Sequence, residues 1–218
     1  FEAMVATPVA ASSNVAIGTS AMGGACTGNT VSNYNVAIGH DVMLSGSLSG
    51  ANQNVGIGYV ALTTLTSGDT NTAIGASAGK LLTSGAGNTA IGASAMANGD
   101  VTGNYNVALG ETAGYDLAGG ASNTLLGAYA GQNVTTANKL VFIGVNAGDA
   151  VTVTGGSNIS DGTVGIGYEA LKALTSGAHN IAIGWTALTQ HTTGSKNIAI
   201  GYGAMADTAG GDGTAATS

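Results

Sequence analysis

Residues 71–75 read Asn-Thr-Ala-Ile-Gly, and the same five residues return 17 positions later at 88–92. Successive copies of the unit begin 17 to 23 residues apart, and 17 is the commonest spacing. Self-similarity at a short fixed period is typical of a repeat architecture, so the pattern predicts a solenoid. Related pentapeptides occupy 14–18, 35–39, 54–58, 106–110, 123–127, 140–144, 163–167, 180–184 and 197–201, which makes eleven copies.

The unit has a fixed glycine, counted here as position 4 when the leading residue is position 0. Position 3 is Ile or Leu in every copy, and position 7 is Ala in every copy except one, which has Val42. A residue without a Cβ adopts positive φ at little cost, so we predict that this glycine turns a corner. The predicted corner residues are Gly18, Gly39, Gly58, Gly75, Gly92, Gly110, Gly127, Gly144, Gly167, Gly184 and Gly201.

Positions 0 to 3 predict a short strand. Side chains alternate along a strand, so positions 1 and 3 share one face while positions 0 and 2 share the other. Stacked in register, the invariant aliphatic residue at position 3 would form an Ile ladder down the core, and the Asn at position 0 a ladder of amides bonded from coil to coil. Within 168–174, Ala170, Leu171 and Leu174 have helical spacing, which fits one helical turn or a second short strand.

The predicted fold class is therefore all-β: a parallel β-solenoid of eleven coils of about 17 residues, roughly 50 Å long at a strand separation of about 4.8 Å. We divide the chain into a lead-in segment at 1–13, the repeat domain at 14–206 and a Gly/Ala/Thr tail or linker at 207–218. A coil this short has a thin interior, which favours several chains packed side by side.

Composition excludes several functions. The chain has four Lys, no Arg and a formal charge of -7, so it lacks the basic patch that binds nucleic acid. No unbroken apolar run approaches the roughly 18 to 20 residues of a membrane-spanning helix, so we expect no membrane insertion. The single Cys26 cannot form an internal disulfide.

No catalytic or metal site is expected. The three histidines occupy different positions of the unit, whereas a metal site needs ligands that converge. The eleven acidic residues are spread along the chain and do not form the paired carboxylates of a glycosidase. We therefore predict no enzyme, no cofactor and no metal.

The uninterrupted pattern Asn-x-Ala-Ile-Gly-x-x-Ala resembles the head repeats of trimeric autotransporter adhesins, the YadA-like β-roll, over residues 14 to about 206. It is also similar to repeats of phage tail and capsid fibres, and the 17-residue period favours this branch because the adhesin unit is shorter. The resemblance implies a homotrimer in which each chain winds a left-handed roll and inner faces meet at the threefold axis. A coiled-coil stalk and a membrane anchor are not seen in this sequence.

Two regions are candidates for ligand contact. Position 5 holds Tyr59 and then Tyr168, Trp185 and Tyr202 in three consecutive copies. This row fits either a sugar-stacking strip or a ladder that stabilises stacking or fills a seam between chains. The copy at 140 is six residues longer than the unit, and we predict that residues 154–162 protrude and contact ligand. The candidates there are Thr154, Ser157, Asn158 and Asp161.

The expected function is a structural, receptor-facing segment of a phage tail or capsid fibre that attaches to a host surface. Its partners would be its own copies, other fibre or virion components and a host-surface glycan or protein, at a virion surface or in an extracellular setting. The alternatives are the head of a bacterial cell-surface adhesin and an ice- or surface-binding solenoid. The last needs a regular outward Thr array, but position 1 holds Thr in only three copies.

Overall fold

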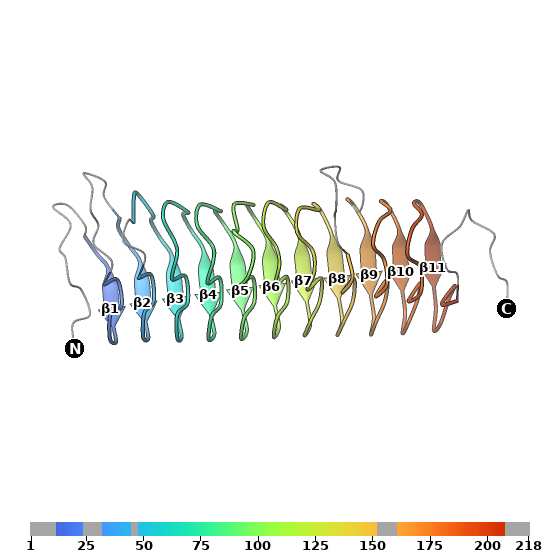
Figure 1. The fold of residues 1–218 in the computed structure, drawn as a ribbon, viewed down its shortest axis with the longest axis horizontal. Helices are drawn as coiled ribbons and strands as arrows, with labels where there is room; N and C mark the ends of the chain where they lie inside the picture. Colours follow the sequence, from blue (N-terminus) through green and yellow to red (C-terminus); the bar gives the residue numbers. More distant parts are fainter. Residues whose placement is uncertain (1–11, 24–31, 45–47, 152–160, 208–218) are drawn as a thin grey trace.

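The computed structural model describes residues 12–23, 32–44, 48–151 and 161–207, and these form a rod of stacked coils (Figure 1). Each coil contributes one three-residue strand to a single parallel sheet in sequence order. We name each coil by its strand. The strands are β1 (Val15–Ile17), β2 (Val36–Ile38), β3 (Val55–Ile57), β4 (Thr72–Ile74), β5 (Thr89–Ile91), β6 (Val107–Leu109), β7 (Thr124–Leu126), β8 (Val141–Ile143), β9 (Val164–Ile166), β10 (Ile181–Ile183) and β11 (Ile198–Ile200).

Every strand pairs with the next in the register of the repeat. Thr72 lies opposite Thr89 and Ile74 opposite Ile91. The register also holds across the long copy, where Val141 pairs with Val164. The prediction of an all-β parallel β-solenoid is thus confirmed. The predicted protrusion at 154–162 falls almost entirely within residues 152–160, which lie outside the described residues.

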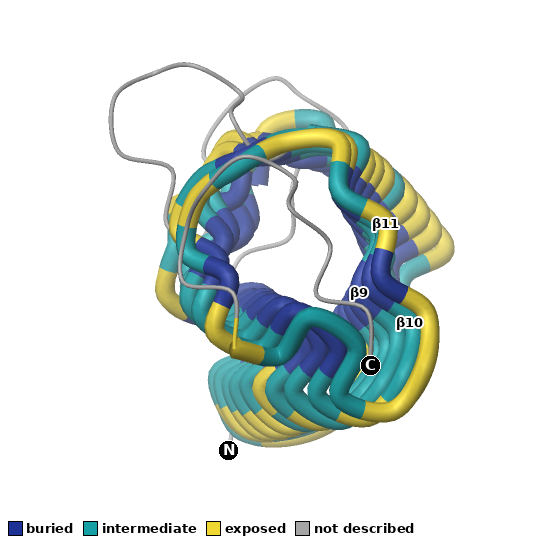
Figure 2. The backbone as a smooth tube through the Cα atoms, turned by 90° about the vertical axis from the view of Figure 1, so that its right-hand side faces the viewer, coloured by how far each residue is buried: buried dark blue, intermediate teal, exposed yellow. Residues whose placement is uncertain are grey.

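The prediction that position 3 forms an Ile ladder in the core is wrong. The residue at position 2 faces inward: Ala73 is fully buried and Ala90 is 1% exposed. Ile74 and Ile91, at position 3 of the same two strands, remain partly exposed. Viewed along the rod, buried residues line the inside of the ring (Figure 2). Alanine is selected there because the returning chain packs directly against this face of the sheet.

The return segment of each coil, which runs from the corner glycine to the next strand, supplies most of the large core side chains. They come from positions 8 and 11, which form columns along the rod beside the alanines of position 7. Position 11 gives Leu65 and Leu82, and position 8 gives Leu62 and Met96, all buried. Most coils therefore pair a small residue on the strand with larger ones on the return segment, as close packing of a narrow interior requires.

The return segment is not helical. Its positions 6 and 8 both have left-handed backbone conformations, as at Ser94 (φ 57°) and Met96 (φ 49°). Two positive φ angles separated by one residue are incompatible with a right-handed helical turn, whose residues all have negative φ. The predicted helical turn per coil is absent from the described residues, and the helical spacing of Ala170, Leu171 and Leu174 reflects successive core positions of a tight turn.

The asparagines at position 0 form the coil-to-coil ladder. Asn71 donates from its backbone N to Asn54 Oδ1 at 2.8 Å and from Nδ2 to the same oxygen at 3.0 Å. Its Nδ2 also donates to the Gly85 carbonyl at 2.9 Å. Each buried amide thus joins its own coil to both neighbours, which satisfies the polar atoms inside the rod.

A second, less regular row of polar side chains lies two residues before position 0 of each copy. The backbone N of Asn52 donates to Asp69 Oδ1 at 2.7 Å, and the backbone N of Ala121 to Asn138 Oδ1 at 2.8 Å. These side chains are half-buried or exposed, so the row reinforces the outer edge of the stack. Its signal in the sequence is weak because alanine replaces the acceptor in three copies, at Ala86, Ala121 and Ala178, and Ser195 Oγ takes the place of a carboxylate or amide oxygen in another.

Candidate functional site

The outer face of the sheet is aliphatic along the whole rod. Positions 1 and 3 of all eleven strands point away from the core, and we call these side chains the outer stripe. They are Val, Ile or Leu except at Thr72, Thr89 and Thr124, and none is charged. At the ends of the rod the stripe is well exposed, with Ile17 at 57% and Ile200 at 67%.

In the middle of the rod most of the stripe is half-buried, because in-register neighbours on adjacent strands cover each other's sides, and Leu109 of β6 stays 48% exposed. What remains open is the tips of the side chains. The outer stripe is therefore a continuous apolar strip with no cover from the described part of this chain. A soluble protein seldom exposes a contiguous apolar patch above about 300–600 Å² without a binding role.

All eleven predicted corner glycines follow a strand, with φ between 119° at Gly18 and 141° at Gly110. The corner also needs the space that glycine leaves. A Cβ built on Gly92 would lie 2.6 Å from the carbonyl carbon of Gly110 in the next coil. Because the same approach recurs up the stack, these residues bring successive corners together and end each strand at the same edge.

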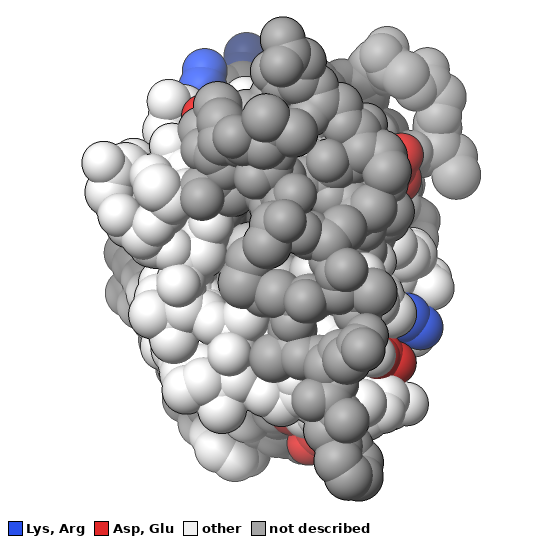
Figure 3. Space-filling model, turned by 90° about the vertical axis from the view of Figure 1, so that its left-hand side faces the viewer, with Lys and Arg blue, Asp and Glu red and all other residues white. Residues whose placement is uncertain are grey.

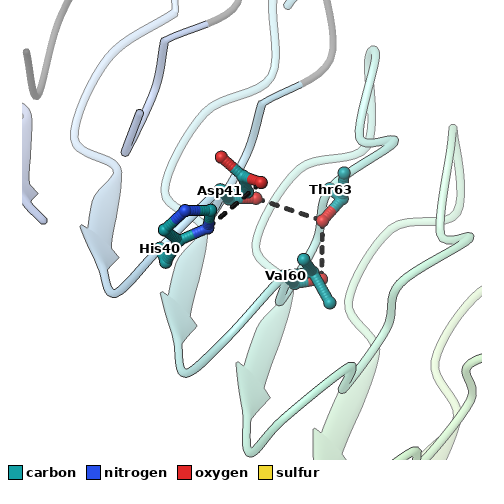
Figure 4. Close-up of polar contacts among 4 residues, drawn as sticks. All are labelled: His40, Asp41, Val60 and Thr63. Atoms are coloured by element: carbon teal, nitrogen blue, oxygen red, sulfur yellow. Dashed lines mark hydrogen bonds and ion pairs between the residues drawn. The ribbon is translucent and has the colours of Figure 1, made fainter. Parts of the chain in front are cut away.

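The residue after the corner, position 5, borders the outer stripe on one side. Near the N-terminal end it carries His40 and Tyr59, whose ring centroids are 5.6 Å apart. His40 Nδ1 lies 3.1 Å from Asp41 Oδ2, and Thr63 Oγ1 donates to the Asp41 and Val60 carbonyls (Figure 4). These contacts tie the β2 and β3 corners together, so here the row has a structural role.

The same row near the C-terminal end holds the predicted aromatic ladder. The Tyr168 and Trp185 rings are stacked, with centroids 4.3 Å apart and planes 23° apart. Trp185 is 52% exposed and Tyr202 is 85% exposed. The structure thus brings Tyr168 and Trp185 together, and it leaves Tyr202 open at the last described coil.

The other predicted contact residues are not gathered into a site. Thr154, Ser157 and Asn158 lie outside the described residues. Asp161 accepts a hydrogen bond from the backbone N of Asn138 at 2.7 Å, so it belongs to the second polar row. Its carboxylate therefore helps to join one coil to the next.

A polar hollow of about 440 Å³, which the sequence pattern did not predict, lies on the same coils as the aromatic pair. Its lining comes from three consecutive coils: Asp149 and Ala150 in β8, Glu169, Lys172 and Ala173 in β9, and Thr189 and Gln190 in β10. Lys172 Nζ donates to Glu169 Oε1 at 2.7 Å. Positions 9 and 10 of three successive copies hold Asp149, Lys172 and Gln190. This run of polar residues in the sequence could have indicated the hollow.

The pKa values of the two carboxyl groups in the hollow are shifted in opposite directions. The hydrogen bond from Lys172 holds the pKa of the Glu169 carboxyl below its usual range, and the same bond raises the pKa of the Lys172 ammonium. Burial raises the pKa of Asp149, against the smaller opposing effect of the Lys172 charge. The Asn133 Nδ2 amide, 3.3 Å away, donates to Asp149 Oδ1.

Charge is sparse elsewhere. Seen from the N-terminal end, the described surface is mostly uncharged, with isolated charged side chains at its margins (Figure 3). Within the described ranges, no three His, Cys, Asp or Glu residues gather as metal ligands, and no helix is long and apolar enough to cross a membrane. Comparison with protein-family models, with curated proteins and with solved structures found no match.

Proposed function

We propose that this chain is a rigid, non-catalytic segment of an attachment fibre and that copies of it associate through the outer stripe into a homotrimer. The observation that carries the proposal is the uncharged aliphatic strip along all eleven strands. Removing apolar surface from water contributes about 25 cal/mol per Å² toward association, from which the entropy cost of bringing the chains together is subtracted, so a strip that runs the length of the rod favours assembly.

The width of the stripe supports a shared central axis. It is only two side chains wide, about 7 Å for residues two apart on a strand, while its length is about 50 Å for eleven strands. Narrow faces of this kind can meet around a common axis along the whole length of parallel rods. Three copies and left-handed winding are the arrangement implied by the resemblance to adhesin heads and phage fibres, and we adopt both as part of the proposal.

A fibre role also fits the way in which successive coils are joined. The sheet register is unbroken over eleven strands, and buried amides join most adjacent coils. A rod built this way holds a distal binding element at a fixed distance from its base. We propose attachment to a glycan or protein of a host surface, at a virion surface or in an extracellular setting. A bacterial adhesin head is the alternative, because the same rod would serve there.

The mass of the assembly in solution tests the proposal. Light scattering should give about 62 kDa, three times the 20.8 kDa chain. A single species of the chain mass would overturn the self-association, and a stable dimer would overturn the trimer.

A paired variant locates the interface. Ile91→Lys places a charge in the middle of the outer stripe and should dissociate the assembly, because a buried unpaired ammonium is strongly unfavourable. Thr136→Lys, at an exposed site on a return segment, is the matched control and should leave the mass unchanged. If both variants keep the parental mass, the stripe is not the interface.

A further inference from the structure

We infer that the polar hollow between the β8, β9 and β10 coils binds one neutral sugar residue, with the Tyr168–Trp185 pair as its aromatic border. This inference rests on the proposed attachment function and assigns it a ligand class and a place on the rod. The hollow is within the range of about 300–1,000 Å³ found for small-molecule sites.

The polar groups of the hollow are arranged for hydroxyl recognition. Glu169 and Lys172 are held in place by their 2.7 Å contact, and Asp149 is held by the Asn133 amide. Among the described residues, no hydrogen bond uses the Thr189 hydroxyl or the Gln190 side-chain amide. The hollow thus combines fixed charged groups with a free hydroxyl and a free amide, which donate and accept as sugar hydroxyls do.

Charge selects against the other ligand classes. Two carboxylates and one ammonium leave a net negative hollow, which disfavours phosphate, sulfate and acidic sugars. The Lys172 ammonium is bonded to Glu169 and repels a second cation, so a divalent metal is also disfavoured. An apolar ligand would leave the partly buried Asp149 carboxylate without a polar partner for its remaining lone pairs.

The aromatic border adds the apolar half of sugar recognition. Tyr168 directly precedes Glu169, a lining residue of the hollow, so the aromatic pair stands on the same coils as the polar groups. Trp185, stacked on Tyr168, is half exposed. The C–H face of a hexose can pack on an aromatic ring while its hydroxyls reach the polar groups, and the stack keeps the ring in place.

The regular coils provide an internal control. At position 5 the β4 and β5 coils have Ala76 and Ala93, and at position 6 they have serines in place of an acid. Lys80 of β4 occupies the same repeat position as Lys172 but has no acidic neighbour at position 6. The combination of aromatic, acid, ammonium and amide is therefore specific to the C-terminal third of the rod.

Ligand-observed NMR on the full chain in its native assembly tests the inference. The probes are lactose and N,N′-diacetylchitobiose as neutral sugars and 3′-sialyllactose as the acidic counterpart. We expect saturation transfer to at least one neutral sugar, a change in Trp185 fluorescence, and weaker binding of the sialylated probe. No transfer to either neutral sugar, or tighter binding of 3′-sialyllactose, would overturn the inference.

Variants at the lining complete the test. Gln190→Ala and Lys172→Gln should each weaken sugar binding about tenfold, since the first removes the side-chain amide and the second removes the charged donor. Lys80→Gln should have no effect. Thermal melting establishes that the variants are folded, and equal sugar affinity in folded variants would overturn the site. Light scattering keeps the two proposals separate: a trimer that binds no sugar refutes this inference alone, while a monomer that binds sugar refutes the trimer alone.

Discussion

The coils from β3 to β7 and the two coils that follow them, β8 and β9, are hydrogen-bonded to their neighbours in different ways at position 0. In the first region every position 0 is Asn, and each amide bridges to its neighbours at 2.8–3.1 Å, as Asn54, Asn71 and Asn123 do. In the second region Leu140 and Thr163 occupy position 0. Within the described ranges, the Thr163 hydroxyl makes two contacts of 3.4 Å, to the Gly177 carbonyl and from the Asn180 backbone N.

The sheet nevertheless continues through the second region without a change of register, from Val141 to Val164 to Ile181. The backbone ladder and the apolar columns therefore suffice to align adjacent coils, and the Asn ladder adds local stability. The interruption of the amides coincides with the 23-residue copy and with the polar hollow. Departures from the repeat inside the rod and on its outside occur in the same coils.

Core packing differs between the regions in a compensated way. In β8 position 2 is Phe142, where most coils have Ala, and position 8 is Gly148, where β3 and β5 have Leu62 and Met96. A Cβ on Gly148 would lie 2.5 Å from ring atoms of Phe142. In β8 the large core residue stands on the strand and Gly148 leaves room for its ring, and β7 pairs Leu125 with Gly131 in the same way.

The largest effect is expected from the corner that both regions share. Gly92→Val should cost at least about 4 kcal/mol of stability, because the site needs φ of 130° and has no room for a Cβ beside Gly110. Ala93→Val, one residue later at an exposed site, is the control and should stay close to the parent. Chemical denaturation followed by circular dichroism measures both, and similar midpoints would contradict the corner argument.

Core compensation gives the next effect. Phe142→Ala should destabilise the chain by about 3–5 kcal/mol through the cavity that it leaves. Adding Gly148→Leu should restore part of the loss, because other coils hold Leu at this position with the same left-handed backbone, as Leu62 does at φ 51°. A double variant no more stable than Phe142→Ala alone would show that the two positions do not share one volume.

Substitutions at position 0 test whether the Asn ladder stabilises the first region more than the second. Asn88→Ala should cost about 2–4 kcal/mol, because it leaves the Asn106 backbone N and the Gly103 carbonyl without their partners. Thr163→Ala should cost less, since its contacts are long. Denaturation midpoints of the two variants provide the comparison, and equal losses would mean that the interruption has no energetic consequence.

The smallest effect is a pH dependence within the hollow. Burial raises the Asp149 pKa, so its ionised form destabilises the fold, and this cost disappears as the pH falls and the carboxyl is protonated. Asp149→Asn should therefore melt slightly above the parent at pH 7, and the difference should vanish toward pH 3. Glu169→Gln should behave oppositely, because a lowered pKa contributes stability that is present above the unfolded-state value and lost in acid. Melting curves at both pH values distinguish the two, and a pH-independent gap would contradict the burial argument.

The sequence by itself determined the repeat, the parallel sheet, the glycine corners and the Asn ladder. Each follows from one physical fact: in-register stacking places the same repeat position of successive coils in contact. A residue required at one level of the stack is then required at every level, and the requirement is visible as a period. Asn71 and Gly92 could be identified in this way without any knowledge of the cross-section.

Only the tertiary structure decided which strand face is inside. Alternation separates Ala73 from Ile74 but does not say which faces the return segment, and both are apolar. The structure places the small residue inward because Leu62 and Leu65 of the return segment already fill the interior, which leaves the larger aliphatic side chains on the outer stripe. The hollow was hidden for a related reason: Asp149, Lys172 and Gln190 are far apart along the chain, and only the stacking of three coils makes them neighbours.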